Sequence, residues 1–170
     1  MTITPVFSES QIARRVSELG IELRRDAGNG EICLIGILKG TSVFLGDLLR
    51  RIPGEVHFQW VNVMTDFADT ETAEATEIDF VTQIDIRGKN CYILKDVVTT
   101  GVIDNYLMTQ FRQREPKDLK LVALLDIPES RRVQLNPEFH AFTAQPGIFV
   151  GYGLESRDRY GNLPFIGLLP

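Results

Sequence analysis

The sequence has few of the residues that build metal centres, disulfides or catalytic triads. Its 170 residues include two cysteines and two histidines. Cys33 and Cys91 each lie in an apolar stretch, with no further cysteine or histidine at metal-ligand spacing. His57 and His140 have no serine or cysteine motif around them. We therefore expect two reduced core thiols and two structural or surface histidines.

Long apolar runs and an excess of positive charge are also missing. No run reaches the roughly eighteen apolar residues of a membrane span, and residues 1–9 carry no basic patch followed by an apolar run. The formal net charge of -5 disfavours general binding to nucleic acid or anionic membranes, so any anion site has to be local. We expect a cytoplasmic protein that binds neither nucleic acid nor membrane.

Apolar residues are plentiful and evenly distributed. They make up 44% of the chain, which suffices for one substantial core, and 170 residues are short for two domains. The sequence has no internal repeat or low-complexity segment, and its prolines and glycines fall singly at the ends of predicted elements. We expect one domain over residues 1–170.

The apolar patterns predict alternating strands and helices. Ser8 and Gln11 fit a capping box, and the apolar stripe that follows at intervals of three and four ends at Gly28. The run 32–38 is apolar without alternation, which is typical of a strand buried on both faces of a parallel sheet. Further strands are predicted at 57–64, 91–94, 119–125, 149–154 and 165–169, and further helices at 43–51 and after Gly101. The alternation predicts an α/β fold, a single domain with a mainly parallel twisted sheet flanked by helices.

Two segments could hold an anion, because each follows a buried strand at the edge where parallel sheets bind ligands. In Lys95-Asp96-Val97-Val98-Thr99-Thr100-Gly101, hydroxyl groups and a glycine precede a helix whose backbone N–H groups attract phosphate. In Lys39-Gly40-Thr41, a lysine and a tight turn could hold a diphosphate. Each segment alone is explained more simply, as a helix cap or a solvated turn lysine. Their shared sheet edge favours a common site.

These segments belong to an ordered series of motifs that covers nearly the whole chain. The series comprises Ser8-Glu9-x-Gln11-Ile12, Val16-x-Glu18-Leu19-Gly20, Arg24-Arg25-Asp26, Gly36-x-Leu38-Lys39-Gly40, Arg87-Gly88-Lys89, Lys95-Asp96-x-x-x-Thr100-Gly101, Val122-x-x-Leu125-Asp126, Phe139-x-x-Phe142, Phe149-Val150-Gly151-Tyr152-Gly153-Leu154 and Tyr160-x-Asn162-Leu163-Pro164. It resembles the bacterial hypoxanthine phosphoribosyltransferases. The resemblance implies a type I phosphoribosyltransferase fold, dimers or tetramers, and transfer of a phosphoribosyl group from phosphoribosyl pyrophosphate to a purine base with magnesium.

Compared with that family, the phosphoribosyl loop is altered. The family's Glu-Asp pair is Lys95-Asp96 here, so one carboxylate that approaches the ribose hydroxyls is replaced by a cation. The aspartate taken as the general base falls at Thr99, whose hydroxyl is a poor proton acceptor near neutral pH. The loop's second hydroxyl falls at Ile103, whereas Thr100 and Gly101 remain. The resemblance thus implies phosphate binding without the usual base.

The positions that contact the purine are altered too. The lysine that reads the exocyclic oxygen falls at Ile127, and the stacking aromatic falls at Ile148, next to Phe149. The Ser-Tyr pair of the family's mobile loop falls near Val63-Met64, and the following stretch 65–77 is acidic and threonine-rich. We expect this stretch to be a mobile loop that repels a diphosphate.

The pyrophosphate side retains part of the family's set. The pyrophosphate loop is kept as Leu38-Lys39-Gly40. The metal-linked aspartate becomes Glu155, which could bind Mg²⁺. The pyrophosphate arginine falls at Gly161, and Arg157 or Arg159 could substitute from a shifted register.

These replacements together predict a homologue of hypoxanthine-guanine phosphoribosyltransferase with weak or lost catalysis. Its cleft would still bind a small anion, either a nucleotide or a ligand like phosphoribosyl pyrophosphate. One alternative is an active purine or altered-base phosphoribosyltransferase, in which Lys95, Glu155 and nearby arginines supply charge differently. Another is a regulatory or interaction subunit that pairs with an intact paralogue. A globular α/β domain that binds no ligand is the remaining alternative. We expect a homo-oligomer, either a dimer or a tetramer.

Overall fold

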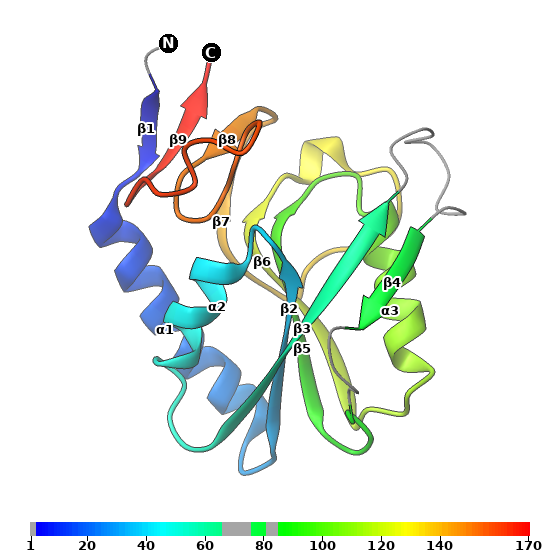
Figure 1. The fold of residues 1–170 in the computed structure, drawn as a ribbon. Helices are drawn as coiled ribbons and strands as arrows, with labels where there is room; N and C mark the ends of the chain where they lie inside the picture. The colour runs from blue at the N-terminus through cyan, green and yellow to red at the C-terminus, as the bar shows by residue number, and fades with distance from the viewer. Residues whose placement is uncertain (1–2, 66–75, 81–84) are drawn as a thin grey trace.

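The computed structural model describes residues 3–65, 76–80 and 85–170 and shows an α/β fold (Figure 1). Its main sheet has six strands in the order β4-β3-β2-β5-β6-β7, and only β4 is antiparallel to its neighbour. The strands are β2 (Ile32–Leu38), β3 (Val56–Thr65), β4 (Thr76–Phe80), β5 (Asn90–Val98), β6 (Asp118–Asp126) and β7 (Phe139–Thr143). The predicted fold class is confirmed, and the five parallel strands end at one edge.

Helices cover both faces of this sheet. α1 (Glu9–Ala27) and α2 (Ser42–Leu49) lie on one face, and α3 (Val102–Arg112) lies on the other (Figure 1). α1 begins at the predicted capping box, where the Gln11 backbone N–H donates to Ser8 Oγ at 3.3 Å and the Ser8 N–H donates to Gln11 Oε1 at 2.8 Å. None of the helices in the described ranges is both long and apolar enough to span a bilayer.

A second, smaller sheet lies above the carboxyl ends of the parallel strands (Figure 1). Its strands β1 (Thr4–Phe7), β9 (Ile166–Leu169) and β8 (Ile148–Val150) pair antiparallel, so both ends of the chain lie side by side. Sequence reasoning missed β1, because its four residues include a proline and show no strand pattern. It recognised part of β7 as the motif Phe139-x-x-Phe142 but did not predict a strand there. These strands are held by partners that are distant in sequence.

Two predicted boundaries need correction. The strand predicted at 149–154 ends at Val150, because Gly151, Tyr152 and Gly153 have φ of 95°, 52° and 93° and turn the chain. The strand predicted at 91–94 continues to Val98, because its parallel pairing with β6 continues to the end of that strand. Lys95 and Asp96 therefore lie in β5 and not in the loop.

The predicted mobile loop 65–77 falls mainly outside the described residues. Residues 66–75 are not described, whereas Thr65 ends β3 and Thr76 begins β4. These two residues pair across the antiparallel strands, so both ends of the stretch are strand.

The two cysteines are brought together by the sheet. Cys33 in β2 and Cys91 in β5 are paired in register across the parallel strands, and both are buried free thiols. The predicted burial of both thiols is confirmed. Their proximity could not be read from the sequence, because it depends on which strands are neighbours.

The Asp26 carboxylate joins α1 to the sheet and makes stability depend on pH. It accepts hydrogen bonds from Tyr92 Oη at 2.7 Å and Lys120 Nζ at 2.6 Å. Burial raises the pKa of Asp26, but these two hydrogen bonds and the lysine charge lower it below its ordinary value. The ionised form therefore stabilises the fold, an effect that is present above the unfolded pKa and is lost as the pH falls through the lower folded pKa.

We expect Asp26→Asn to lower the free energy of unfolding at pH 7 by about 1.5–3 kcal/mol, since it weakens a charged hydrogen-bonded group. The difference from wild type should shrink below about pH 4, where the unfolded-state carboxyl is protonated. Urea denaturation at pH 7 and pH 3 measures both values. Asp85→Asn is the control, because its side chain is 80% exposed. An Asp26→Asn loss that is equal at both pH values would contradict the linkage.

Candidate ligand-binding cleft at the carboxyl ends of the strands

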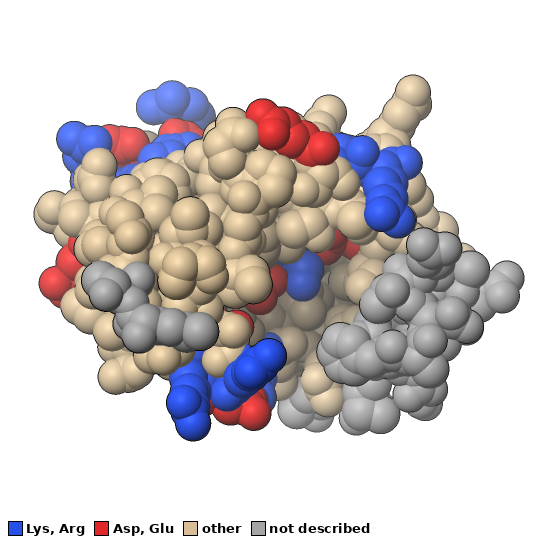
Figure 2. All heavy atoms as spheres, turned by 90° about the horizontal axis from the view of Figure 1, so that it is seen from above, with Lys and Arg blue, Asp and Glu red and all other residues tan. Residues whose placement is uncertain are grey.

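The structure brings the two predicted segments together. β2 and β5 are neighbours, so the segments that follow them lie side by side. Gly40 lies so close to the Asp96 carboxylate that a Cβ atom at this position would overlap it. Figure 2 looks onto this edge and shows a hollow with basic and acidic side-chain atoms side by side at its base. This hollow is the candidate cleft.

The turn at 39–41 is held by its own hydroxyl groups. Thr41 is buried and its Oγ1 donates to the Ile37 carbonyl at 2.6 Å, while Ser42 Oγ donates to the Lys39 carbonyl at 2.6 Å. The Leu38-Lys39 peptide bond is cis. The Lys39 ammonium is exposed and lies 3.1 Å from Asp158 Oδ1 and 3.6 Å from Glu155 Oε2.

The loop before α3 presents backbone donors to the cleft. Gly101 has φ of 79° and is the N-cap residue, and no side chain of the described residues caps the helix there. The Val102 N–H donates weakly to Thr100 Oγ1 at 3.4 Å. Since the first N–H groups of a helix lack partners within the helix and carry positive dipole charge, this terminus suits an anion. Ile103, at the family's second hydroxyl position, is exposed in the first turn.

Lys95 lies on β5 beside Asp96, the residue that approaches Gly40. Its Nζ lies 3.0 Å from Asp96 Oδ1, and its side chain is 24% exposed. Burial lowers the pKa of Lys95, but the charges of Asp96 and Asp104 raise it by more, so the pKa lies above its ordinary value. The ammonium is therefore charged at neutral pH.

Asp104 was missed by sequence reasoning. It is 5% exposed, burial raises its pKa, and its Oδ1 has no hydrogen-bond partner among the described residues. The available signal was its spacing, because Asp104 lies three residues before Leu107 and four before Met108 on the buried stripe of α3. An acidic residue on such a stripe indicates a buried charge partner.

A second buried ion pair also escaped sequence reasoning. Arg131 follows a short 3-10 helix (Pro128–Ser130), and its guanidinium pairs with Asp126 at the end of β6, with both side chains 10% exposed. The same guanidinium donates to the Thr99 carbonyl. It therefore fixes the backbone of the loop at Thr99, whose own side chain is exposed.

Of the three residues predicted for the base pocket, Ile127 and Phe149 belong to the same buried core cluster, whereas Ile148 is exposed. Ile127 is buried and follows β6, where its N–H donates to the Val98 carbonyl at 3.0 Å. Ile148 and Phe149 lie on β8 in the small sheet, where adjacent side chains point to opposite faces. Phe149 packs into the core cluster, and its assignment to the base pocket stays a prediction. Ile148 is 58% exposed.

Ile148 instead lines a cavity of about 510 Å³ with the two candidate arginines, Arg157 and Arg159. Arg157 lies within, and Arg159 at the end of, a tight turn in which Ser156 and Arg159 are bridged. Gly161 lies against Glu155, because a Cβ atom at Gly161 would come within 2.8 Å of Glu155 Cγ. The assignment of Glu155 as a metal ligand stays a prediction, and the described residues contain no group of three His, Cys, Asp or Glu side chains that could hold a metal.

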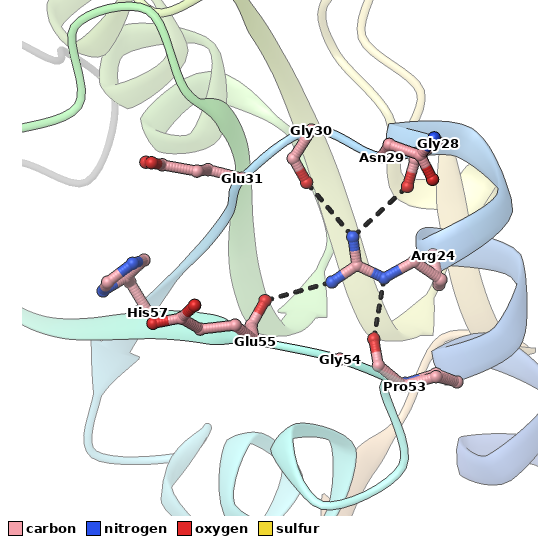
Figure 3. A pocket seen from close by; sticks show the side chains of 9 residues that line it. All are labelled: Arg24, Gly28, Asn29, Gly30, Glu31, Pro53, Gly54, Glu55 and His57. Atoms are coloured by element: carbon pink, nitrogen blue, oxygen red, sulfur yellow. Dashed lines mark hydrogen bonds between the residues drawn. The ribbon is translucent and has the colours of Figure 1, made fainter.

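A different hollow of about 480 Å³ lies at the opposite edge, near the amino ends of β2 and β3 (Figure 3). Arg24 points into it and donates to the carbonyls of Pro53, Gly28, Gly30 and Glu55 at 2.7, 3.3, 3.1 and 3.0 Å. The guanidinium thus ties the end of α1 to the entry of β3. This hollow has a structural role and lies away from the cleft.

Comparisons with known proteins agree with this geometry. A family model described as Phosphoribosyl transferase domain matches residues 5–157. The hypoxanthine-guanine phosphoribosyltransferase of Bacillus subtilis (strain 168) is 32% identical over 166 residues, which are 96% of this chain and 91% of that protein.

Solved structures show the same relationship. The crystal structure of a hypoxanthine-guanine phosphoribosyltransferase from Bacillus anthracis, with a HEPES molecule in its active site, is 34% identical, with a TM-score of 0.94 over 99% of this chain and 100% of that chain. A hypoxanthine phosphoribosyltransferase from Staphylococcus aureus is 29% identical, with a TM-score of 0.91 over 98% of this chain and 90% of that chain. Since sequence, fold and family model agree over most of its length, this chain belongs to the phosphoribosyltransferase family.

Proposed function

We propose that this protein binds a nucleotide or another phosphate-bearing ligand in the cleft and transfers phosphoribosyl groups weakly or not at all. The observation that carries the proposal is that the carboxylates around the cleft are already paired with cations. Asp96 pairs with Lys95, Asp126 with Arg131, and Glu155 with Lys39. The oxygens of these carboxylates are therefore already engaged by ammonium or guanidinium groups of the protein, which leaves them less available to a substrate.

The missing base adds to this effect. The resemblance puts the family's general base at Thr99, and loss of a general base costs about a hundred- to ten-thousand-fold in rate. Lys95 also places an ammonium where the family has a second carboxylate. Both changes reduce the ability of the cleft to accept a proton from a purine while leaving its attraction for an anion.

Ligand binding is supported by the groups that remain. These groups are the α3 N-terminus after Gly101, the Thr100 hydroxyl and the Lys39 ammonium, on the two segments that follow the neighbouring strands β5 and β2. Donors of this kind bind phosphate through hydrogen bonds to its oxygens and through charge. The ligand class is therefore a small anion, with a purine nucleotide as the first candidate.

An active phosphoribosyltransferase is the second candidate. The relatives in B. subtilis and B. anthracis are described as hypoxanthine-guanine phosphoribosyltransferases, and they favour purine salvage with phosphoribosyl pyrophosphate and Mg²⁺. A single domain over residues 1–170, a dimer or tetramer, pairing with an intact paralogue and a cytoplasmic location also stay predictions.

Nucleotide formation and ligand binding should be measured in parallel. We expect no product above background from hypoxanthine, guanine or xanthine with phosphoribosyl pyrophosphate and Mg²⁺, but a thermal shift with GMP or IMP. Gly40→Ala should remove the shift, because its methyl group would overlap Asp96. Gly46→Ala is the matched control, since its methyl group would meet open space.

Two results would contradict the proposal. Turnover at ordinary enzyme rates would establish the active transferase in its place. Absence of both product and thermal shift would show that the cleft does not bind these ligands.

A further inference from the structure

The segment that follows β6 is joined to the loop before α3 at neighbouring residues. The Arg131 guanidinium donates to the Thr99 carbonyl, and the Arg132 backbone N–H donates to the Thr100 carbonyl at 2.9 Å. The methylene stem of Arg131 also lies against Gly101, because a Cβ atom at Gly101 would come within 3.0 Å of Arg131 Cδ. All three residues of the 99–101 loop are therefore in contact with this one segment.

The guanidinium that makes the first of these contacts is itself anchored to the sheet. It pairs with Asp126, the last residue of β6, and both side chains are 10% exposed. Its charge also acts on the buried Asp104 carboxylate of α3. Since β6 is the neighbour of β5, which leads into the loop, and α3 leads out of it, Arg131 links the loop to the elements around it.

Fold stability alone gives little reason to bury an arginine at this position. A buried ion pair is often no more stabilising than well-packed apolar residues of similar volume, because both charges lose their hydration. Arg131 Nε also lacks a hydrogen-bond partner among the described residues, which adds a further cost. The bond to the Thr99 carbonyl is what the guanidinium provides and an apolar side chain could not.

The conformation of this loop determines where the first N–H groups of α3 point. Gly101 is the N-cap residue, with φ of 79°, and no side chain of the described residues caps the helix there. Backbone donors of this kind bind an anion when they converge on it. The apparent Kd of a ligand rises as the fraction of molecules in the binding-competent conformation falls. A bond that keeps the loop in one conformation therefore strengthens anion binding without touching the anion.

We propose that Arg131 is a positioning residue for anion binding: held by Asp126, it holds the Thr99 carbonyl and so keeps the 99–101 loop in the conformation that presents the α3 N-terminus. Because Asp126 and Asp104 offset its charge, Arg131 acts through geometry and not by attracting the ligand. This inference rests on the proposed function, since it concerns the same ligand in the same cleft.

Isothermal titration of GMP into the folded variants tests the role of Arg131. Arg131→Met should raise the Kd about tenfold or more, the effect of one charged hydrogen bond. Arg131→Lys keeps one charged donor and should raise the Kd less than Arg131→Met does. Arg132→Met is the matched control, because it removes the same charge from an exposed neighbouring side chain and keeps the backbone bond to Thr100. Its Kd should stay within about threefold of wild type, since exposed charges are screened by salt.

Asp126→Asn separates positioning from simple electrostatics. It removes a negative charge at the carboxyl end of β6, so electrostatics alone would tighten the binding of GMP, which is an anion. Positioning has the opposite sign, because Arg131 loses its charged partner, and the Kd should rise about threefold or more. Hydrogen exchange of the ligand-free proteins is the second readout. The amides of residues 99–103 should exchange faster in Arg131→Met and Asp126→Asn than in wild type.

Each contrary result has a distinct meaning. A folded Arg131→Met protein that binds GMP like wild type, or an Asp126→Asn protein that binds GMP more tightly, would overturn the positioning role and leave the proposed function standing. Weakened binding with unchanged exchange at residues 99–103 would also overturn it, since Arg131 would then contact the ligand itself. No binding of GMP by the wild type would overturn both. Thermal unfolding verifies that each variant is folded, and Arg131→Lys with Asp126→Asn provides the same comparison if Arg131→Met does not fold.

Discussion

The Thr99→Asp variant should form purine nucleotide from hypoxanthine and phosphoribosyl pyrophosphate at least about a hundredfold faster than wild type, the usual effect of a general base. Thr99 is exposed in the loop after β5, and Arg131 holds its backbone. A carboxylate introduced there meets no acidic side chain within the loop and lies near a guanidinium, so it would be ionised at neutral pH. A continuous absorbance assay of nucleotide formation measures the rate.

The Thr99→Asn variant is the isosteric control. It fills the same space without accepting a proton, so its rate should equal that of wild type, and both variants should retain the GMP thermal shift. A wild-type enzyme that already turns over at ordinary rates, and that Thr99→Asp changes little, would place the general base on another residue. If the Thr99→Asp protein forms no nucleotide but still shows the GMP thermal shift, then Lys95 or the altered purine pocket limits the rate of nucleotide formation.

The Gly151→Ala variant should lower the free energy of unfolding by about 2–5 kcal/mol, the sum of a left-handed backbone and an overpacked core. Gly151 has φ of 95°, and a Cβ atom there would overlap the carbonyl oxygen of Phe165. The residue turns the chain from β8 toward Leu154, whose carbonyl accepts its N–H at 2.9 Å. Urea denaturation followed by circular dichroism gives the free energy.

Gly46→Ala provides the comparison within the same chain. Gly46 lies inside α2 and a methyl group there meets open space, so this variant should gain about 0.5–1 kcal/mol from the better helix propensity of alanine. If both glycine variants unfold at the same urea concentration as wild type, then the turn at position 151 does not require a residue without a Cβ atom.

The parts of the fold that the sequence predicted well are those set by neighbouring residues. The capping box of Ser8 and Gln11 closes within one helical turn, and the apolar run 32–38 matches β2 residue for residue. The position of the two candidate anion-binding segments at one sheet edge also followed, because parallel strands present their carboxyl ends together. By contrast, β5 was predicted too short, since a lysine and an aspartate interrupt its apolar pattern although pairing with β6 continues.

In the candidate site, too, the sequence identified individual residues but not the contacts between them. Local sequence, with the family resemblance, pointed to Thr99, Lys95 and Lys39, but it could not show that Phe149 points into the core. It also could not reveal the pairing of Arg131 with Asp126 or the action of Asp104 on Lys95, because these depend on where a loop and a helix pack.

By itself, the sequence determined the class of fold and the order of its main elements, because these follow from residue type and from contacts within a few positions. Only the tertiary structure decided which charges meet in the cleft and which strands form the small sheet. β1 pairs with β9 across almost the whole chain, and Lys39 meets Glu155 from more than a hundred positions away. Coulombic attraction and strand pairing act through space, and no local pattern records them.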